Sequence, residues 1–255
     1  QRQMCIRDSY QYSYDLRPDW SRRFGTWDEI CDYLEDVADR NGVTPRIRFN
    51  TAVESADFDE QSGTWQLALG NGETLAADIL VCAPGQLSNP KIPDVPGRES
   101  FAGAQFHSAE WVHSVDLAGK RVAVVGSGAS AIQIVPAIAD QVGHLTLVQR
   151  HPNWIVGKKD WAPSNIEKTL GRRFPFLLRW YHNLMWLYFE SRYPLVLRKA
   201  DPVRKVWEKI LRRQIARSLA DDQKTAACTP DYPLGCNRIL LSSEWYPTIA
   251  RADVS

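Results

Sequence analysis

The residues of this sequence best suited to chemistry are two glycines spaced as in a nucleotide-binding turn. Gly126 and Gly128 belong to the run Gly-Ser-Gly-Ala-Ser-Ala, which follows an apolar run at 122–125 and opens a helical pattern. In such a strand–turn–helix unit, the first glycine permits a tight turn and the second lets backbone N–H groups approach a pyrophosphate. The helix N-terminus adds partial positive charge. The alternative is a glycine-rich turn in an ordinary βαβ unit. The predicted cofactor-binding residues here are Gly126, Ser127, Gly128, Ala129, Ser130 and Ala131.

The end of the next strand indicates which nucleotide is bound. Residues 145–148 form a second strand-like run, and Gln149 and Arg150 follow it. An NAD site would present Asp or Glu to the ribose hydroxyls there, whereas a planar guanidinium accommodates a 2′-phosphate. Gln149 and Arg150 are therefore predicted to bind NADP(H), and the alternative is a surface arginine in a loop.

Composition places the chain among ordinary globular proteins. It has 255 residues, a net charge of +1, 44% hydrophobic and 24% charged residues, enough for one or two domains with a sizeable core. The whole-chain charge does not favour nucleic acid as a partner. The five cysteines include no C-x-x-C pair and no Cys/His cluster at zinc spacing, so we expect no metal site and a cytoplasmic location. No apolar run has the length of a transmembrane helix.

A helix and several strands are predicted before the glycine turn. Thr26 and Glu29 have capping-box spacing, and the predicted helix ends at Asn41-Gly42. Its inward face would carry Ile30, Tyr33, Leu34, Val37 and Ala38. Strands are predicted at 47–50, 53–58, 64–69 and 74–82, the last of them buried. The proline-rich stretch 84–98 reads as an extended crossing between domains.

Four residues just after that crossing carry a family resemblance. Phe101, Gly103, His107 and Trp111 have the spacing F-x-G-x-x-x-H-x-x-x-W, immediately upstream of the glycine turn. This pattern resembles the fingerprint of the type I Baeyer–Villiger monooxygenases, which are related to the flavin-containing monooxygenases, and the resemblance runs from about Tyr10 to the end. It implies an α/β flavoprotein with two dinucleotide-binding domains, FAD and NADP(H) as cofactors, and insertion of oxygen from O2 into a ketone to give an ester or lactone.

The resemblance also implies roles for two catalytic candidates. Arg238 matches the arginine that lies beside the flavin and stabilises the negatively charged peroxyflavin, and His107 matches a residue that couples the domains near the nicotinamide. A solvent-facing charge at a strand end and a packed or capping histidine are the respective alternatives. The sequence departs from the family pattern at Trp27, Pro84, Val112 and Asn237. The last departure removes a cation that would help to hold the 2′-phosphate.

Length is the largest departure from the family. A flavoprotein of this class begins with its own FAD-binding βαβ unit of about 30 residues, and nothing before Thr26 supplies one. We therefore expect an internal fragment of a longer enzyme, inactive by itself. The predicted divisions are 1–9 (non-native), 10–85 (incomplete FAD domain), 86–156 (Rossmann-like NADP domain), 157–229 (helical insertion) and 230–255 (return strand of the NADP domain, truncated).

The predicted helical insertion is strongly basic. From Val156 to Arg217 the sequence has 15 Lys or Arg against 5 acids, a local charge of +10. The basic helix 202–219, with Val206, Ile210 and Ile215 inward, could lie on an anionic membrane or a nucleic acid. The alternative is a solvated basic face on an insertion that packs over the nucleotide domain, with a core covering the apolar residues around 174–198. We expect no nucleic-acid partner and at most a weak peripheral membrane contact.

Three functions from different classes follow. The first is the ketone-oxygenating, FAD- and NADPH-dependent monooxygenase. The second is a relative that oxidises nitrogen or sulfur, against which Trp111 argues because those relatives usually lack this residue. The third is a non-catalytic NADP-binding remnant without an FAD phosphate loop.

Overall fold

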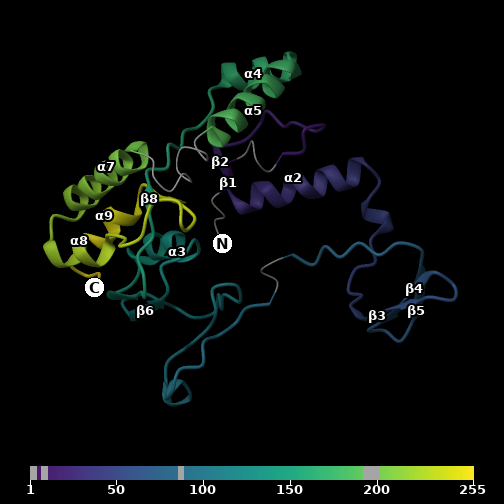
Figure 1. Cartoon of the computed structure of the whole chain (residues 1–255), viewed down its shortest axis with the longest axis horizontal. Coiled ribbons are helices and arrows are strands. Elements are labelled where there is room, and N and C mark those ends of the chain that lie inside the picture. Colours follow the sequence, from purple (N-terminus) through teal and green to yellow (C-terminus); the bar gives the residue numbers. More distant parts are fainter. Residues whose placement is uncertain (1–4, 7–10, 86–88, 192–201) are drawn as a thin grey trace. The chain divides into compact units, whose positions relative to one another are not determined.

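The structure, a computed structural model, describes residues 5–6, 11–85, 89–191 and 202–255. The chain divides into two compact units (Figure 1): one joins 1–34 with 112–255, and the other is 35–111. The predicted boundary between residues 85 and 86 falls inside the second unit. The helix α2, Trp27–Arg40, runs across the division at residue 34.

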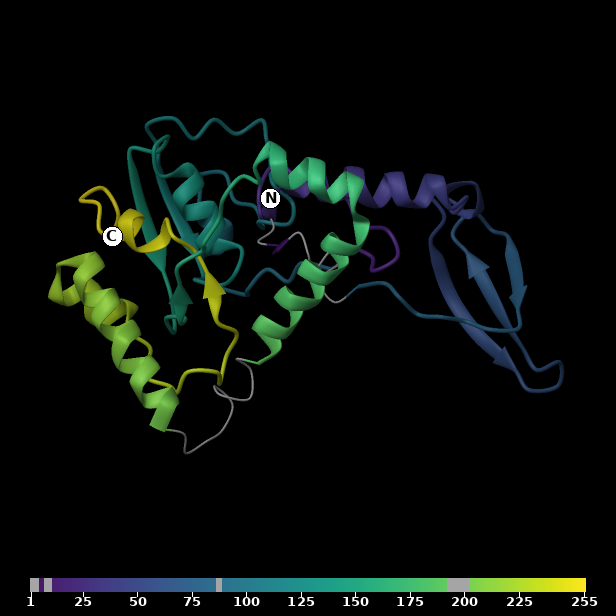
Figure 2. The same ribbon diagram turned by 90° about the horizontal axis from the view of Figure 1, so that it is seen from above.

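The second unit is built on an antiparallel meander. Its strands are β3 (Val53–Asp59), β4 (Thr64–Leu69) and β5 (Thr74–Ala77), side by side in that order (Figure 2). Gly63 and Gly72 adopt positive φ angles of 68° and 85° in the two turns, which favours glycine there. Short 3₁₀ turns, η1 (Thr44–Arg46) and η2 (Arg98–Ser100), flank the meander in the sequence.

Of the strands predicted for this unit, 47–50 is wrong and 74–82 is confirmed only for its first four residues. Residues 47–50 form no strand, and Asn50 has φ 54°, which an extended strand excludes. The predicted strand 74–82 ends at Ala77. Its partner β4 runs antiparallel and begins at Thr64, so only one residue of β4 lies beyond the pair formed by Ala77 and Trp65. The predicted burial of its end is also wrong, since Ile79 and Val81 are 80% and 79% exposed.

The helix predicted after Thr26 is confirmed, with one error on its inward face. The Glu29 carboxylate accepts hydrogen bonds from the backbone N–H of Thr26, at 3.3 Å, and from its hydroxyl, at 3.4 Å. Gly42, at φ 64°, follows the helix end. Ile30, Tyr33 and Val37 are buried and Ala38 is half-buried, whereas Leu34 is exposed.

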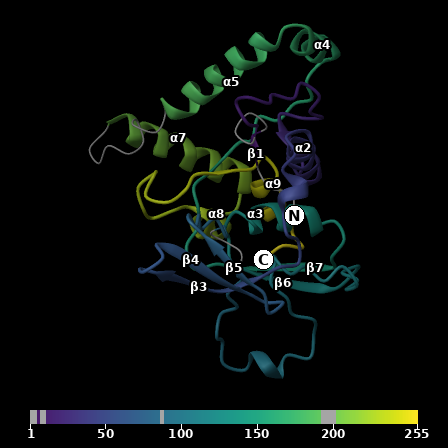
Figure 3. The ribbon, with the colours of Figure 1, turned by 90° about the vertical axis from the view of Figure 1, so that its right-hand side faces the viewer.

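The first unit contains the predicted βαβ element. The strands β6 (Arg121–Val125) and β7 (His144–Val148) are parallel neighbours (Figure 3), joined by α3 (Ala131–Ile138). Val254 continues the sheet as a parallel bridge to Leu145. The core of this element includes Ile132, Val135 and Leu145, and α9 (Trp245–Ile249) packs beside α3. This sheet positions the glycine turn at the carboxyl end of β6.

Two further strand pairs complete the sheets of the first unit. The pair β8 (Ile155–Val156) and β9 (Leu240–Leu241) is parallel, and β1 (Cys5–Ile6) with β2 (Phe24–Gly25) is antiparallel. Just before β8, the buried Trp154 packs with Leu211 and Leu234, and its indole N–H donates to the Tyr232 carbonyl oxygen at 3.1 Å.

The described residues of the predicted insertion form the helices α4 (Asn165–Arg173), α5 (Pro175–Glu190), α7 (Pro202–Leu219) and α8 (Asp222–Cys228). Pro175 and Pro202 each begin a helix, as the missing N–H of proline allows, while Pro194 lies outside the described residues. None of the helices in the described ranges is long and apolar enough to cross a membrane.

The predicted inward faces of these helices are partly wrong. On α7, Ile215 is buried as predicted, but Val206 and Ile210 are exposed. The Trp154 cluster contacts the face of α7 that carries Leu211, and that choice turns Val206 and Ile210 away from it. The core expected for the apolar residues around 174–198 does not cover Phe176 and Trp180, which are exposed, whereas Leu178 and Met185 are half-buried. Residues 192–198 lie outside the described residues.

Candidate functional site

The turn after β6 has the backbone geometry of a nucleotide-binding turn. Gly126 has φ 108°, a conformation that side chains disfavour, and its N–H donates to the Val148 carbonyl oxygen at 2.8 Å. A Cβ added at Gly128 would meet no atom within 4 Å. Internal packing therefore does not account for the missing side chain at Gly128, and the open space fits a ligand close to the backbone.

The backbone donors of this turn are free. In the described part of the chain, the N–H groups of residues 127–131 donate no hydrogen bond. Ser130 stands at the N-cap of α3 without a side-chain capping bond, while Ala131 is buried against the rest of the unit, as close helix packing requires. Free N–H groups at a helix N-terminus form an anion site. They fit the pyrophosphate of a dinucleotide.

The side chain of Ser127 points into the protein. Ser127 is 7% exposed, and its hydroxyl donates to the His151 carbonyl oxygen at 3.1 Å. The Asn153 amide donates in turn to the Ser127 carbonyl oxygen at 2.8 Å. A contact from Ser127 to a cofactor would therefore come from its backbone. Asn153 was missed in the sequence, where its only signal is a polar residue beside the buried Trp154.

We expect Ser127→Ala to lower the free energy of unfolding by about 1 kcal/mol, because it leaves the His151 carbonyl without its donor. Ser130→Ala is the matched control: it removes a hydroxyl that makes no capping bond, so its effect should stay within about 0.5 kcal/mol. Chemical denaturation of both variants measures the difference. Equal effects would contradict a bracing role for the Ser127 hydroxyl.

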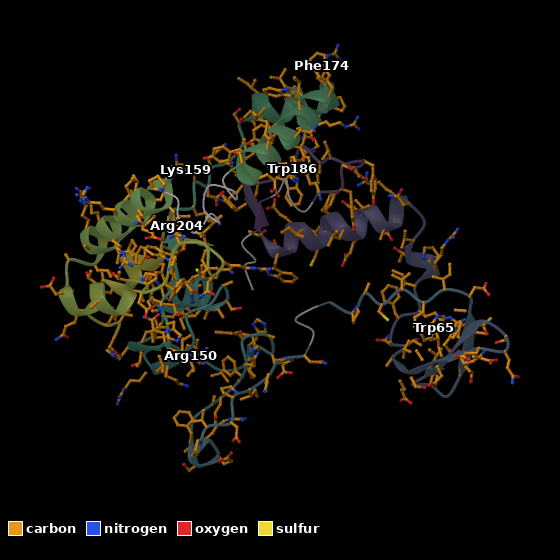
Figure 4. The ribbon with its side chains drawn as sticks, viewed as in Figure 1. Trp65, Arg150, Lys159, Phe174, Trp186 and Arg204 are labelled. Atoms are coloured by element: carbon orange, nitrogen blue, oxygen red, sulfur yellow. The ribbon has the colours of Figure 1, made fainter. Side chains whose placement is uncertain are left out.

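Gln149 and Arg150 differ in their availability. The Gln149 amide donates to the Ala227 carbonyl oxygen at 2.9 Å, near the end of α8, and is thereby occupied. Arg150, labelled in Figure 4, is exposed and forms no ion pair or hydrogen bond with the residues described. Both were predicted to bind the cofactor. The geometry leaves the Arg150 guanidinium available to a phosphate and gives the Gln149 side chain a structural contact.

The helix α8, which accepts the hydrogen bond from Gln149, is itself held to the sheet by a lysine. Sequence analysis did not single out this lysine. Lys224 on α8 donates to three backbone carbonyl oxygens, those of Ile249, Arg251 and Val254, at 2.7–2.8 Å. Because Val254 pairs with β7, this ammonium group ties α8 to the same sheet that ends at Arg150. Burial raises the pKa of the neighbouring Cys228 thiol to about 11.

The two catalytic candidates lie in different units. Arg238 belongs to the unit of the glycine turn, where it is exposed two residues before β9 and makes no ion pair within the described ranges. His107 belongs to the other unit, and its Nδ1 accepts the Ala109 N–H at 3.1 Å, so a neutral ring carries its proton on Nε2. Their roles stay predictions.

The fingerprint residues around His107 pack locally. The rings of Phe106 and Trp111 meet edge to face with centroids 5.0 Å apart. A Cβ at Gly103 would lie 2.5 Å from the ring of Phe101, which is exposed, so a side chain at residue 103 would displace that ring. The described residues also contain no group of three or more His, Cys, Asp or Glu side chains that could hold a metal.

Comparison with known proteins identifies the class. The family described as "Flavin-binding monooxygenase-like" matches residues 4–187. A Baeyer–Villiger monooxygenase of Streptomyces coelicolor is 42% identical over 245 residues, covering 96% of this chain and 47% of that protein. The solved structure of an oxidised steroid monooxygenase bound to NADP covers 100% of this chain and 56% of its own, with TM-score 0.81 and 28% identity. The solved structure of an OTEMO complex with FAD and NADP matches 99% of this chain and 56% of its own, with TM-score 0.82 and 26% identity.

The chain therefore belongs to the flavin-binding monooxygenase-like family, with the α/β fold of its two-dinucleotide-binding flavoproteins. The similarity to a protein named Baeyer–Villiger monooxygenase agrees with the resemblance inferred from the fingerprint, and membership of the flavin-binding monooxygenase-like family is confirmed. The chain spans about half the length of these relatives.

Proposed function

We propose that the full-length gene product is an FAD- and NADPH-dependent monooxygenase that inserts one oxygen atom of O2 into a ketone, giving an ester or lactone. The NADPH part rests on the row of free N–H groups at 127–131 together with the unpaired guanidinium of Arg150, which follows the strand next to the one before that turn. The ketone part is supported by the Trp111 fingerprint and by the Baeyer–Villiger relative.

The residues of this chain have distinct tasks in the proposal. The N–H groups of 127–131 bind the pyrophosphate of NADPH, and Arg150 binds the 2′-phosphate through its fork of donors. Arg238 supplies a positive charge that persists at working pH, because a guanidinium does not deprotonate in proteins. His107, with Nε2–H free to donate, orients a polar group near the nicotinamide rather than exchanging protons with the substrate. When bound, the flavin supplies the oxygen chemistry.

The proposal also covers the reactants of the enzyme, its location in the cell and a contact with a membrane. The partners are a small ketone or other carbonyl compound and O2, and the location is cytoplasmic, as the cysteine pattern predicts. For the basic helical insertion we propose a weak peripheral contact with a membrane surface, based on its local charge of +10, from 15 basic against 5 acidic residues.

A product analysis tests this function. We expect the full-length gene product, given NADPH, ¹⁸O2 and cyclohexanone, to form a lactone that contains one ¹⁸O atom. Parallel reactions with a tertiary amine and a thioether discriminate the alternatives. An N-oxide or sulfoxide with no lactone would assign the protein to the N- and S-oxidising relatives, and NADPH binding without any oxygenated product would leave only the nucleotide-binding remnant.

A further inference from the structure

The outward side of α7 is apolar where a surface helix is usually polar. Val206 and Ile210 are 58% and 47% exposed on the side opposite the buried Leu211 and Ile215, and Trp207, one turn before Leu211, is 46% exposed at the edge between the two sides. A soluble helix normally turns its large apolar residues towards the core. We call the exposed surface of α7 its outer face: its centre carries Val206, Lys209, Ile210, Arg213 and Arg217, and its two edges carry Trp207 and Lys205.

All the free charge on this helix is positive. Glu208 is the one acid of α7, and its Oε1 lies 3.4 Å from the Nε of Arg204, which is labelled in Figure 4. The same oxygen accepts a hydrogen bond from the Leu234 N–H at 2.9 Å. Arg212 donates to the Pro230 carbonyl oxygen at 2.7 Å. The remaining cations are exposed and have no ion pair among the described residues. They are Lys205, Lys209, Arg213 and Arg217.

A hollow on the same helix combines charge with apolar surface. It has a volume of about 450 Å³ and is lined by Ile210, Arg213, Gln214, Arg217 and Ser218. Arg213 and Arg217 are one helical turn apart, so their guanidinium groups can approach the same anion. Arginine binds phosphate oxygens bidentately, and Ile210 offers a contact for a hydrocarbon chain attached to that phosphate. The hollow therefore fits a phosphate that carries an acyl chain.

We propose that the outer face of α7 binds an anionic phospholipid membrane, with Val206, Trp207 and Ile210 at the headgroup–acyl boundary and a lipid phosphate between Arg213 and Arg217. Tryptophan and basic residues on an amphipathic helix are the residue types that membrane interfaces favour. A nucleic acid fits less well, because its phosphate backbone offers nothing to the aliphatic side chains between the cations. The proposal rests on the peripheral contact proposed above and is independent of ketone oxygenation.

The apolar surface of α5 lacks the cations that accompany the apolar residues on α7. The helix α5 exposes Phe176, Trp180 and Trp186, of which the last is labelled in Figure 4, but Arg179 is its only arginine or lysine. Charge complementarity to an anionic bilayer therefore favours α7 over α5. The two helices also give the experiment a built-in comparison.

Vesicle flotation tests the proposal. The full-length gene product should float with vesicles of phosphatidylglycerol and phosphatidylcholine in about equal parts, but not with phosphatidylcholine alone. We expect R213E/R217E and, separately, W207S/I210S to weaken the partition at least about tenfold. The matched control K120E/R121E makes the same charge change at two exposed positions of the same unit and should alter it less than about twofold. Thermal unfolding of each variant checks that it folds.

The possible outcomes distinguish the proposed membrane contact of the helical insertion from the assignment of that contact to the outer face of α7. An equal loss in K120E/R121E would overturn the α7 site and indicate non-specific attraction. If W180S on α5 abolished flotation while W207S/I210S did not, the peripheral contact would stand and its assignment to α7 would fall. No flotation of the parent protein would overturn both. Binding of a single-stranded oligonucleotide in preference to anionic vesicles, lost in R213E/R217E, would replace the lipid with a nucleic acid.

Discussion

Replacing Arg238 with alanine should leave NADPH consumption running while ester formation falls about 100-fold or more in the full-length gene product. The proposed role of Arg238 is to hold negative charge that develops on oxygen in a water-poor site, and the loss of one such preorganised contact typically costs two to three orders of magnitude. Hydrogen peroxide should account for the NADPH consumed. Parallel measurement of NADPH, peroxide and ester checks this balance.

Two comparisons make the Arg238 result specific. Arg238→Lys keeps the charge but loses the planar fork, and a lysine in such a setting can release its proton, so we expect ester formation between that of the parent and Arg238→Ala. Arg213→Ala removes an exposed arginine of the same unit and should leave the ratio of ester to NADPH unchanged. Parent-level ester formation by Arg238→Ala would withdraw the catalytic role and leave a solvent-facing charge before β9.

The second large effect concerns the choice of nucleotide. Arg150→Ala should weaken NADPH binding by about 1 to 3 kcal/mol, the usual range when a charged hydrogen-bonding partner is lost. NADH, which lacks the 2′-phosphate, should bind nearly as before. Titration calorimetry with both nucleotides measures the two affinities directly and does not depend on turnover.

The β6–β7 sheet provides the control for Arg150. Arg121 is an exposed arginine at the start of β6, paired with His144, so it lies at the edge of the sheet opposite the end that precedes Arg150. Arg121→Ala makes the same change in charge without touching the predicted phosphate site and should affect neither nucleotide. Equal weakening of NADPH and NADH by Arg150→Ala would refute nucleotide selection by this residue.

The sequence by itself determined the elements whose signals are local. Apolar runs at 122–125 and 145–148 on either side of the glycine turn predicted β6, α3 and β7, because alternation and helical spacing are properties of neighbouring residues. The positive φ required at Gly126 could be expected for the same reason. The fingerprint from Phe101 to Trp111 indicated the family, since its spacing needs no knowledge of the fold.

Tertiary structure decided which of these residues are available. The amide of Gln149 is taken by the carbonyl of Ala227, 78 residues away, whereas Arg150 next to it remains free. The same holds for burial: helical spacing allowed either side of α7 to face inward, and the contact between Trp154 and Leu211 selected the side that leaves Val206 and Ile210 exposed. Spacing along a chain fixes which side chains share a face, but only partners distant in the sequence decide where that face points.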